Sequence, residues 1–236
     1  MMIRYLLSAF TVVISAVTLN VANAAGLPPP RAPSIDAQRY VLLDFASNQV
    51  IAETGSQERA DPASITKLMT AYVVFDSLKQ ELMSEDDRVT ISRKAWKAEG
   101  SRMFAEVGTQ VSVADLLRGM IIQSGNDAAI ALAEHTAGSE ESFADRMNQY
   151  AAKLGLKDTQ YRNATGLTHP EHYTTAYDIA HLVYALIQDF PDHYSLYSEK
   201  EFTYNKITQR NRNRLLWRDE SVDGVKTGYT DAAGYC

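Results

Sequence analysis

The sequence has 236 residues, with 23 Lys and Arg against 29 Asp and Glu, which gives a formal net charge of −6. This length suits one large hydrophobic core or two closely joined lobes, and the absence of a basic stripe argues against a nucleic acid partner. Cys236 is the single cysteine, so no internal disulfide can form.

The first 24 residues have the three-part pattern of a secretory signal peptide. A cationic start, residues 1–4, precedes an apolar run, residues 5–21, and the small residues Ala22-Asn23-Ala24. An uncleaved membrane anchor is the alternative, but polar residues interrupt the apolar run, and its end suits cleavage after Ala24. Residues 25–34 are rich in proline and predict an extended linker. We expect an exported, periplasmic protein whose folded domain spans residues 35–236.

The folded part begins with a predicted β-hairpin, residues 39–45 and 49–53 around the turn Ser47-Asn48. Apolar residues at spacings of three and four then predict a helix over 64–78. Further helices follow, each with recognisable start or stop residues. We predict them at 112–122 with a capping box at Ser112, at 126–135 before Gly138, at 139–154 before Gly155, and at 175–188 before Pro191.

Strand character returns at residues 201–204 and 222–229. Strands at both ends of the chain and helices between them predict an α+β fold, in which one sheet is built from both chain ends and a helical lobe from the middle. Residues 231–236 resemble the turn into a further strand. We therefore expect the sequence to be a fragment that lacks C-terminal strands.

Three short motifs each occur once: Ser64-Ile65-Thr66-Lys67, Ser124-Gly125-Asn126 and Lys226-Thr227-Gly228. The first two patterns arise by chance in many chains of this length, and K-T-G is rarer but still only a tripeptide. As an ordered set they match the S-x-x-K, S-x-N, K-T-G signature of penicillin-binding proteins and serine β-lactamases. Each motif also falls where it can act, namely at a helix start, in a loop between helices and on a predicted strand.

Ser64 and Lys67 lie one helical turn apart on the same face, so the amine can reach the hydroxyl. The free N–H groups and positive field of the helix N-terminus disfavour a charged lysine, and Lys226 brought close would lower the Lys67 pKa further. A neutral Lys67 can then take the proton of Ser64.

The other two motifs have structural alternatives. Ser124 can relay a proton and the Asn126 amide can bind a peptide backbone. Taken alone, however, this motif favours an ordinary helix-to-helix turn with Asn126 as the N-cap. Lys226 and Thr227 can bind a terminal carboxylate, and Gly228 leaves room for a peptide that pairs with an edge strand. The alternative for this motif is an exposed strand end with a turn glycine.

Beyond the motifs, the sequence resembles the low-molecular-mass penicillin-binding proteins of type five, the D-alanyl-D-alanine carboxypeptidases. The likeness extends to residues 61–63, 100–104, 123–128, 211–213, 215–217 and 223–225. The resemblance implies a mostly antiparallel sheet packed by helices, plus an all-helical lobe, with the active site between them. It implies an enzyme that removes the terminal D-alanine from peptidoglycan stem peptides and is acylated by β-lactam antibiotics, without a metal or other cofactor.

The resemblance also implies the role of each residue. Ser64 is the acylated nucleophile, Lys67 the base, Ser124 a proton relay and Asn126 a substrate-binding residue. The substrate-binding strand consists of Lys226, Thr227 and Gly228; the backbone N–H groups of Ser64 and Tyr229 form the oxyanion hole, and Arg212 lies near the site. Tyr229 stands where many relatives have His or Thr. Relatives continue with further strands, a β-rich domain and a C-terminal amphipathic anchor on the inner membrane.

Other functions fit the sequence less well. A class A β-lactamase shares the three motifs, but no E-x-x-L-N pattern, which would supply the deacylating glutamate, occurs between Asn126 and Lys226. The segment His169-Pro170-Glu171-His172 suggests zinc, but H-E-x-x-H is absent and the proline opposes a helix there. A non-catalytic peptidoglycan-binding module is the remaining alternative function.

Overall fold

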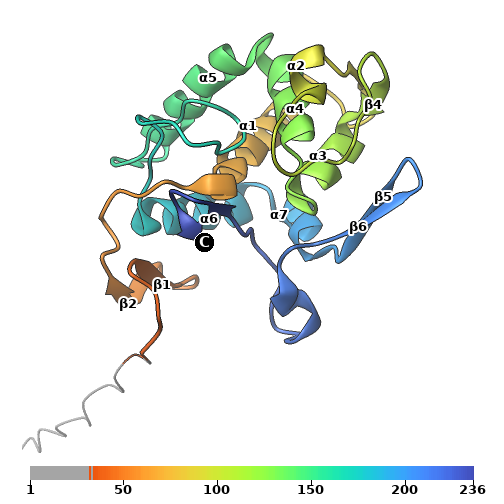
Figure 1. Cartoon of the computed structure of the whole chain (residues 1–236). Helices are drawn as coiled ribbons and strands as arrows, with labels where there is room; N and C mark the ends of the chain where they lie inside the picture. The colour runs from red at the N-terminus through yellow and green to blue at the C-terminus, as the bar shows by residue number, and fades with distance from the viewer. Residues whose placement is uncertain (1–31, 33) are drawn as a thin grey trace, which may run out of the picture. The chain divides into compact units, whose positions relative to one another are not determined.

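The structure is a computed structural model that describes residue 32 and residues 34–236, and residues 36–236 form one unit (Figure 1). The predicted signal peptide and the first part of the predicted linker, residues 25–31, lie outside the described residues. Among the residues that are described, no helix has the length and apolar character needed to cross a membrane.

Helices dominate the middle of the chain and short hairpins flank them. The α-helices are α1 (Lys67–Lys79), α2 (Arg93–Trp96), α3 (Val113–Ile121), α4 (Asn126–Ala137), α5 (Glu140–Lys153), α6 (Ala176–Asp189) and α7 (Pro191–Tyr194), and the 3-10 helices are η1 (Ala63–Thr66), η2 (Ser195–Ser198) and η3 (Arg214–Trp217). The strands are β1 (Tyr40–Asp44), β2 (Gln49–Thr54), β3 (Arg88–Thr90), β4 (Gln110–Ser112), β5 (Glu201–Tyr204), β6 (Ile207–Arg210), β7 (Tyr229–Thr230) and β8 (Gly234–Tyr235).

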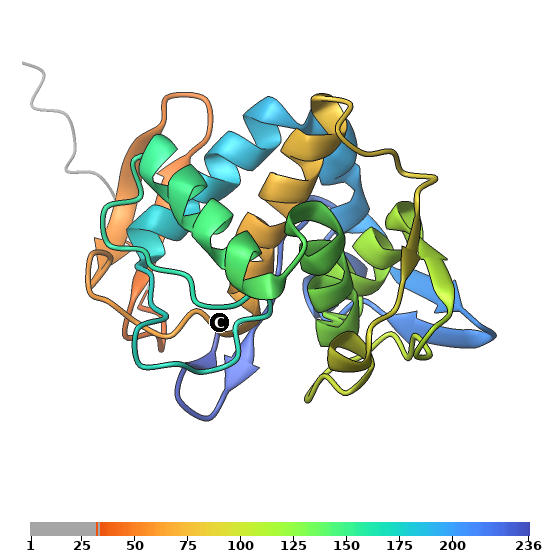
Figure 2. The ribbon, with the colours of Figure 1, turned by 90° about the horizontal axis from the view of Figure 1, so that it is seen from above.

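Helix α1 is the central element of the core. It packs against α3, α4, α5 and α6, and Figure 2 shows these helices gathered around it. From Leu68 to Phe75 every residue of α1 is buried, which fits a helix that is apolar on all faces. Because η1 leads directly into α1, the core holds Ser64 and Lys67 on a rigid support.

Local capping residues set the bounds of the surrounding helices, as the sequence predicts. The Ser112 hydroxyl accepts the N–H of Asp115 at the start of α3, and Thr175 caps α6 in the same way. Gly138, at φ 80°, ends α4 in the left-handed conformation that glycine adopts without a steric penalty.

All the strand pairs among the described residues are antiparallel, and the α+β class is confirmed. The expected single sheet from both chain ends is wrong, because these residues form four separate two-stranded sheets. The N-terminal hairpin β1–β2 packs on α6, whereas β7 lies against η1, and no ladder joins these two hairpins.

The strand predicted over residues 222–229 is also wrong, since only Tyr229–Thr230 is a strand. Upstream of it, a side chain takes the place of a neighbouring strand: the Asn213 amide donates to the Gly224 carbonyl over 2.8 Å. The ladder begins at Gly228, whose N–H and carbonyl pair with the carbonyl and N–H of Cys236. The predicted turn into a further strand is confirmed as β8, which pairs with β7.

Candidate active site

Ser64 and Lys67 meet as their spacing predicts. The Lys67 amine lies 3.0 Å from the Ser64 hydroxyl oxygen, 2.7 Å from Asn126 Oδ1 and 2.6 Å from the carbonyl oxygen of Thr165. A neutral amine has two N–H groups and one lone pair. If both N–H groups point to the two carbonyl-type oxygens, the lone pair is left to face the Ser64 hydroxyl. The geometry therefore suits proton transfer from Ser64 to Lys67.

Electrostatics favour the neutral form of Lys67. The side chain is only 1% exposed. Burial, assisted by the positive charges of Lys226 and Arg212, lowers the pKa of Lys67 well below its ordinary value. Asp127 and Glu140 oppose this shift at longer range. A buried lysine with this pKa shift is a base rather than a fixed charge.

Ser124 and Lys226 form a second hydrogen-bonded pair across the site. The Lys226 amine donates to the Ser124 hydroxyl over 3.0 Å and to the carbonyl of Thr227 over 2.8 Å. Burial, followed by the charge of Arg212, lowers the pKa of Lys226 to about 7. Ser124 itself has φ 67°, a left-handed conformation that costs a residue with a Cβ roughly 1–2 kcal/mol. Such strain commonly marks a functional position.

Asn126 is not a helix N-cap. Gly125 holds that position, and the Asn126 side chain points into the site instead. Its oxygen accepts from Lys67, and its NH₂ group donates to the carbonyl of Glu99 over 2.6 Å. Both ends of the amide are thus fixed, and the structure brings the first two motifs into direct contact.

The third motif lies against the first. A Cβ added to Gly228 would lie 3.1 Å from the backbone nitrogen of Ser64, so any larger residue crowds the nucleophile. One cleft is lined by residues of all three motifs and two others, namely Ser64, Ser124, Asn126, Thr227, Gly228, Tyr229 and Arg212. Lys67 and Lys226 bond to residues that line it. Arg212 donates to the Gln123 carbonyl over 3.2 Å, and the exposed Tyr229 ring packs on Tyr235.

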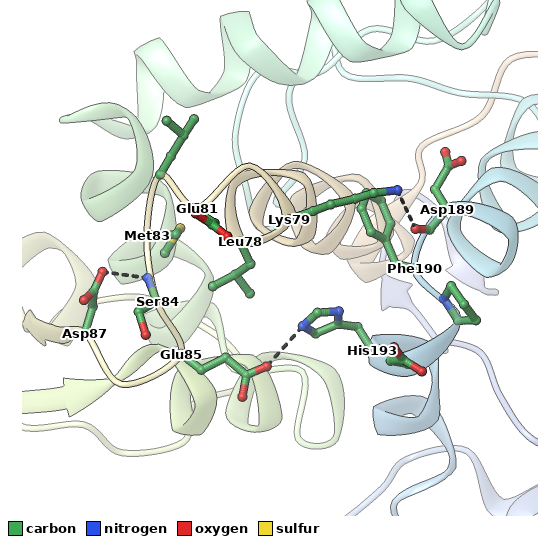
Figure 3. Close-up of a pocket in the computed structure, with 13 residues that line it drawn as sticks. Leu78, Lys79, Glu81, Met83, Ser84, Glu85, Asp87, Asp189, Phe190 and His193 are labelled. Carbon is green, nitrogen blue, oxygen red and sulfur yellow. Dashed lines mark hydrogen bonds and ion pairs between the residues drawn. The ribbon is translucent and has the colours of Figure 1, made fainter.

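Two other features take no part in this cleft. The hollow in Figure 3 lies between the end of α1 and α7, where Lys79 donates to the Asp189 carbonyl and His193 bonds Glu85. The segment that suggested zinc is a loop. Its His172 is buried and bonds the Thr66 hydroxyl over 2.9 Å, so this histidine is joined directly to η1.

A sequence model described as D-alanyl-D-alanine carboxypeptidase matches residues 28–236. The chain belongs to the D-alanyl-D-alanine carboxypeptidase family. D-alanyl-D-alanine carboxypeptidase DacC of Escherichia coli is 52% identical over 211 residues, which cover 86% of this chain and 53% of that protein. DacA of Haemophilus influenzae is 46% identical over 97% of this chain and 58% of its own length. The chain spans about half the length of these curated relatives.

Solved structures agree on the fold of this carboxypeptidase family. Penicillin-binding protein 5 of Haemophilus influenzae superimposes with a TM-score of 0.83 at 47% identity, over 89% of this chain and 61% of that one. Penicillin-binding protein D2 of Listeria monocytogenes, in an ampicillin-bound form, has a TM-score of 0.79 at 28% identity, over 88% and 84%.

Sequence reasoning missed the backbone acceptor of Lys67. The Thr165 carbonyl reaches the amine because the loop that carries it passes close to η1: a Cβ on Gly166 would lie 1.7 Å from the Ala63 carbonyl oxygen. Gly166 also has φ 87°, so no other residue fits there without rearrangement. A carbonyl group leaves no signal in residue type, and the Thr165-Gly166 turn was the only available clue.

Asp127 is a second residue that sequence reasoning did not select. Its fully buried carboxylate accepts the backbone N–H groups of Met103, Phe104, Ala105 and Ala128. Asp127 therefore fixes the segment that follows Ser101. The carbonyl of Ser101 in turn accepts the N–H of Asn126 over 2.7 Å. Asn126 is thus fixed twice: its backbone N–H bonds to Ser101, and its side-chain amide bonds to Lys67 and Glu99.

Proposed function

We propose that this chain carries the serine-type D-Ala-D-Ala carboxypeptidase reaction, through an acyl-enzyme on Ser64. The observation that supports it most is the bonding of Lys67, whose three polar neighbours leave a lone pair of the neutral amine facing the Ser64 hydroxyl. Family membership supports the same reaction, since the relatives are named D-alanyl-D-alanine carboxypeptidases. The substrate is then a peptidoglycan stem peptide that ends in D-Ala-D-Ala.

In this proposal Lys67 takes the proton of Ser64 as Oγ attacks the carbonyl carbon of the penultimate D-alanine. The backbone N–H groups of Ser64 and Tyr229 stabilise the oxyanion, as the family resemblance implies. The proton that Lys67 took then passes through the Ser124 hydroxyl, which is bonded to Lys226, to the amine of the leaving D-alanine as the peptide C–N bond breaks. Lys226 and Thr227 bind the terminal carboxylate. In the second half of the reaction, the oxygen of water bonds to the ester carbon, and the C–Oγ bond to Ser64 breaks. Lys67 carries the proton from the water to Ser64 Oγ.

A β-lactam presents a reactive amide and a carboxylate to the same groups, so it should acylate Ser64. The ampicillin-bound form of the Listeria protein supports this expectation for a related fold. Of the described residues that line the cleft, none is Asp or Glu. No carboxylate is therefore available there to activate water as a class A β-lactamase glutamate does, and the acyl group should persist.

Export to the periplasm and association with the inner membrane through a C-terminal anchor belong to the same proposal. They rest on the signal-peptide pattern of residues 1–24 and on the resemblance. The assignment of residues 35–236 as the catalytic domain stays a prediction.

The test is labelling with a fluorescent penicillin, followed by denaturation and gel electrophoresis, with Ser64→Ala as control. Label that survives denaturation, persists for minutes and is absent from the control supports a serine acyl-enzyme with slow deacylation. Rapid loss of label favours a β-lactamase. Absence of label, both in this chain and in a chain continued past Cys236, leaves the non-catalytic peptidoglycan-binding module.

A further inference from the structure

The cleft at Ser64 has a charge opposite to that of the chain. Four arginines line it, Arg210, Arg212, Arg214 and Arg218, and no acidic residue does so among the described residues. All four are exposed, and none has a carboxylate within ion-pair distance in the described part of the chain. A chain of net charge −6 therefore concentrates unpaired positive charge in one place.

These arginines stand on a fixed wall, defined here as residues 210–218. Exposed arginines alternate with buried asparagines at its start, and the asparagines hold the backbone. Asn211 donates to the carbonyls of Tyr197 and Glu199, and Asn213 donates to that of Gly224. The guanidinium groups are thus presented by a backbone that is already ordered before any ligand arrives, which lowers the entropy lost on binding.

The positive charges in the cleft repel one another, and a bound anion would reduce this repulsion. Arg212 already lowers the pKa of both Lys67 and Lys226, which shows that like charges oppose one another in the cleft. In the proposed function the substrate's terminal carboxylate meets Lys226 and Thr227. That single carboxylate leaves the rest of the wall without a counter-charge. Guanidinium groups bind carboxylates with two parallel hydrogen bonds, so the chemistry of the wall selects carboxylates on a peptide ligand.

We propose that Arg210, Arg214 and Arg218, which lie on this wall, form a second carboxylate subsite. The preferred substrates then carry a free side-chain carboxylate besides their C-terminal one. This inference rests on the proposed function and adds the charge of the substrate to it. It also predicts attraction of anionic peptides into the cleft, because a concave surface of one sign focuses the field.

The test compares two peptides that end in D-Ala-D-Ala and differ only in the preceding residue, Glu or Gln. The ratio of their kcat/KM values is measured within each variant, so differences in the fraction of folded protein cancel. We expect the Glu peptide to be preferred by roughly fivefold or more at low salt, with the preference falling at high salt. The double variant Arg214→Gln/Arg218→Gln should bring the ratio close to one.

The matched control is Arg93→Gln, an exposed arginine on α2 outside the cleft, which should keep the wild-type ratio. A charge-reversed variant, Arg214→Glu/Arg218→Glu, should instead prefer a peptide with Lys at the same position. Equal kcat/KM values for the Glu and Gln peptides in the wild type would overturn the subsite, as would an unchanged ratio in the double variant. If Ser64 takes penicillin label but the ratio is one, only the subsite fails. If no label and no hydrolysis are found, the proposed function fails and the subsite with it.

Discussion

Gly228 and Ser64 are in close contact: a Cβ built on Gly228 would lie 3.1 Å from the Ser64 backbone nitrogen and 3.2 Å from the Cβ of Ala63. The start of the β7–β8 hairpin is therefore fitted to the backbone of the nucleophile. The distance leaves room for a hydrogen atom on Gly228 but not for a methyl group without a shift of a few tenths of an ångström.

Gly228→Ala should therefore slow acylation of Ser64 by about 10²-fold, because a small displacement of reacting groups has an effect of this size. The second-order rate constant for a fluorescent penicillin measures it. Gly155→Ala serves as control: a Cβ there meets open space, but φ is 74°, so it should lower the melting temperature and leave the rate unchanged. A wild-type rate in Gly228→Ala would contradict the proposed fit.

Lys67 should act as a base at neutral pH, since burial lowers its pKa well below the ordinary lysine value. Only the deprotonated amine accepts a proton, so the acylation rate should rise with pH through this lowered pKa and then level off. Lys67→Arg keeps a positive charge that cannot be removed, and it should reduce acylation by about 10³-fold or more. The pH–rate profile of kcat/KM decides, and a single inflection near the free lysine pKa of about 10.4 would refute the role.

Lys226 should set the alkaline limit of carboxylate binding. Its pKa lies at about 7 because of burial and the charge of Arg212, and only its protonated form attracts a carboxylate. Affinity for a D-Ala-D-Ala peptide should then fall as the pH rises above about 7. Arg212→Gln removes the second cause, so it should raise the Lys226 pKa and move this fall to higher pH. Titration of a Ser64→Ala variant with the peptide measures the shift, and a fall at unchanged pH would contradict the assignment.

His172 should make the fold sensitive to acid. Burial, with a smaller contribution from His169, lowers the pKa of His172 from 6.5 to about 4. Its Nδ1 accepts the N–H of Arg162, so the neutral ring carries its proton on Nε2 and donates to the Thr66 hydroxyl. In this pH window the unfolded chain binds a proton that the folded chain does not. Stability is therefore full above about pH 6.5 and falls by on the order of 3 kcal/mol as the pH drops to about 4.

Urea unfolding at pH 7 and pH 4.5 checks this expectation. His172→Gln keeps a donor and an acceptor but does not titrate, so its stability should change less between the two pH values than that of the wild type. An equal change in both proteins would mean that other groups cause the acid sensitivity.

Local sequence signals predicted most of the helices, because a cap such as Ser112 or Gly138 acts within a few residues of the helix it bounds. The pairing of Ser64 with Lys67 is also local, one turn apart on the same support. The single sheet and the strand over residues 222–229 were predicted wrongly because strand pairing depends on residues far apart in the sequence. Whether residues 222–228 form a strand depends on what lies beside them, and the neighbour that bonds Gly224 is the side chain of Asn213.

In the site, too, some features follow from the sequence and others depend on tertiary packing. The residue types and order of the three motifs identified residues that line the cleft, together with Lys67 and Lys226, which bond to residues that line it. The contact of Lys67 with the Thr165 carbonyl joins residues 98 positions apart through a backbone atom, so no side-chain pattern reveals it. The choice between a capping and a binding role for Asn126 also needed the position of Lys67, which only tertiary packing fixes.

The pairing of Cys236 with Gly228 gives this protein a built-in attachment point for an optical reporter. Cys236 is the one thiol in the sequence, its side chain is exposed, and it lines the same cleft as Ser64. A maleimide dye would therefore attach at a single position, on the residue whose backbone forms two hydrogen bonds with Gly228, which in turn lies against the nucleophile. Its emission would follow occupancy of the cleft in real time, for ligands that never react as well as for those that do.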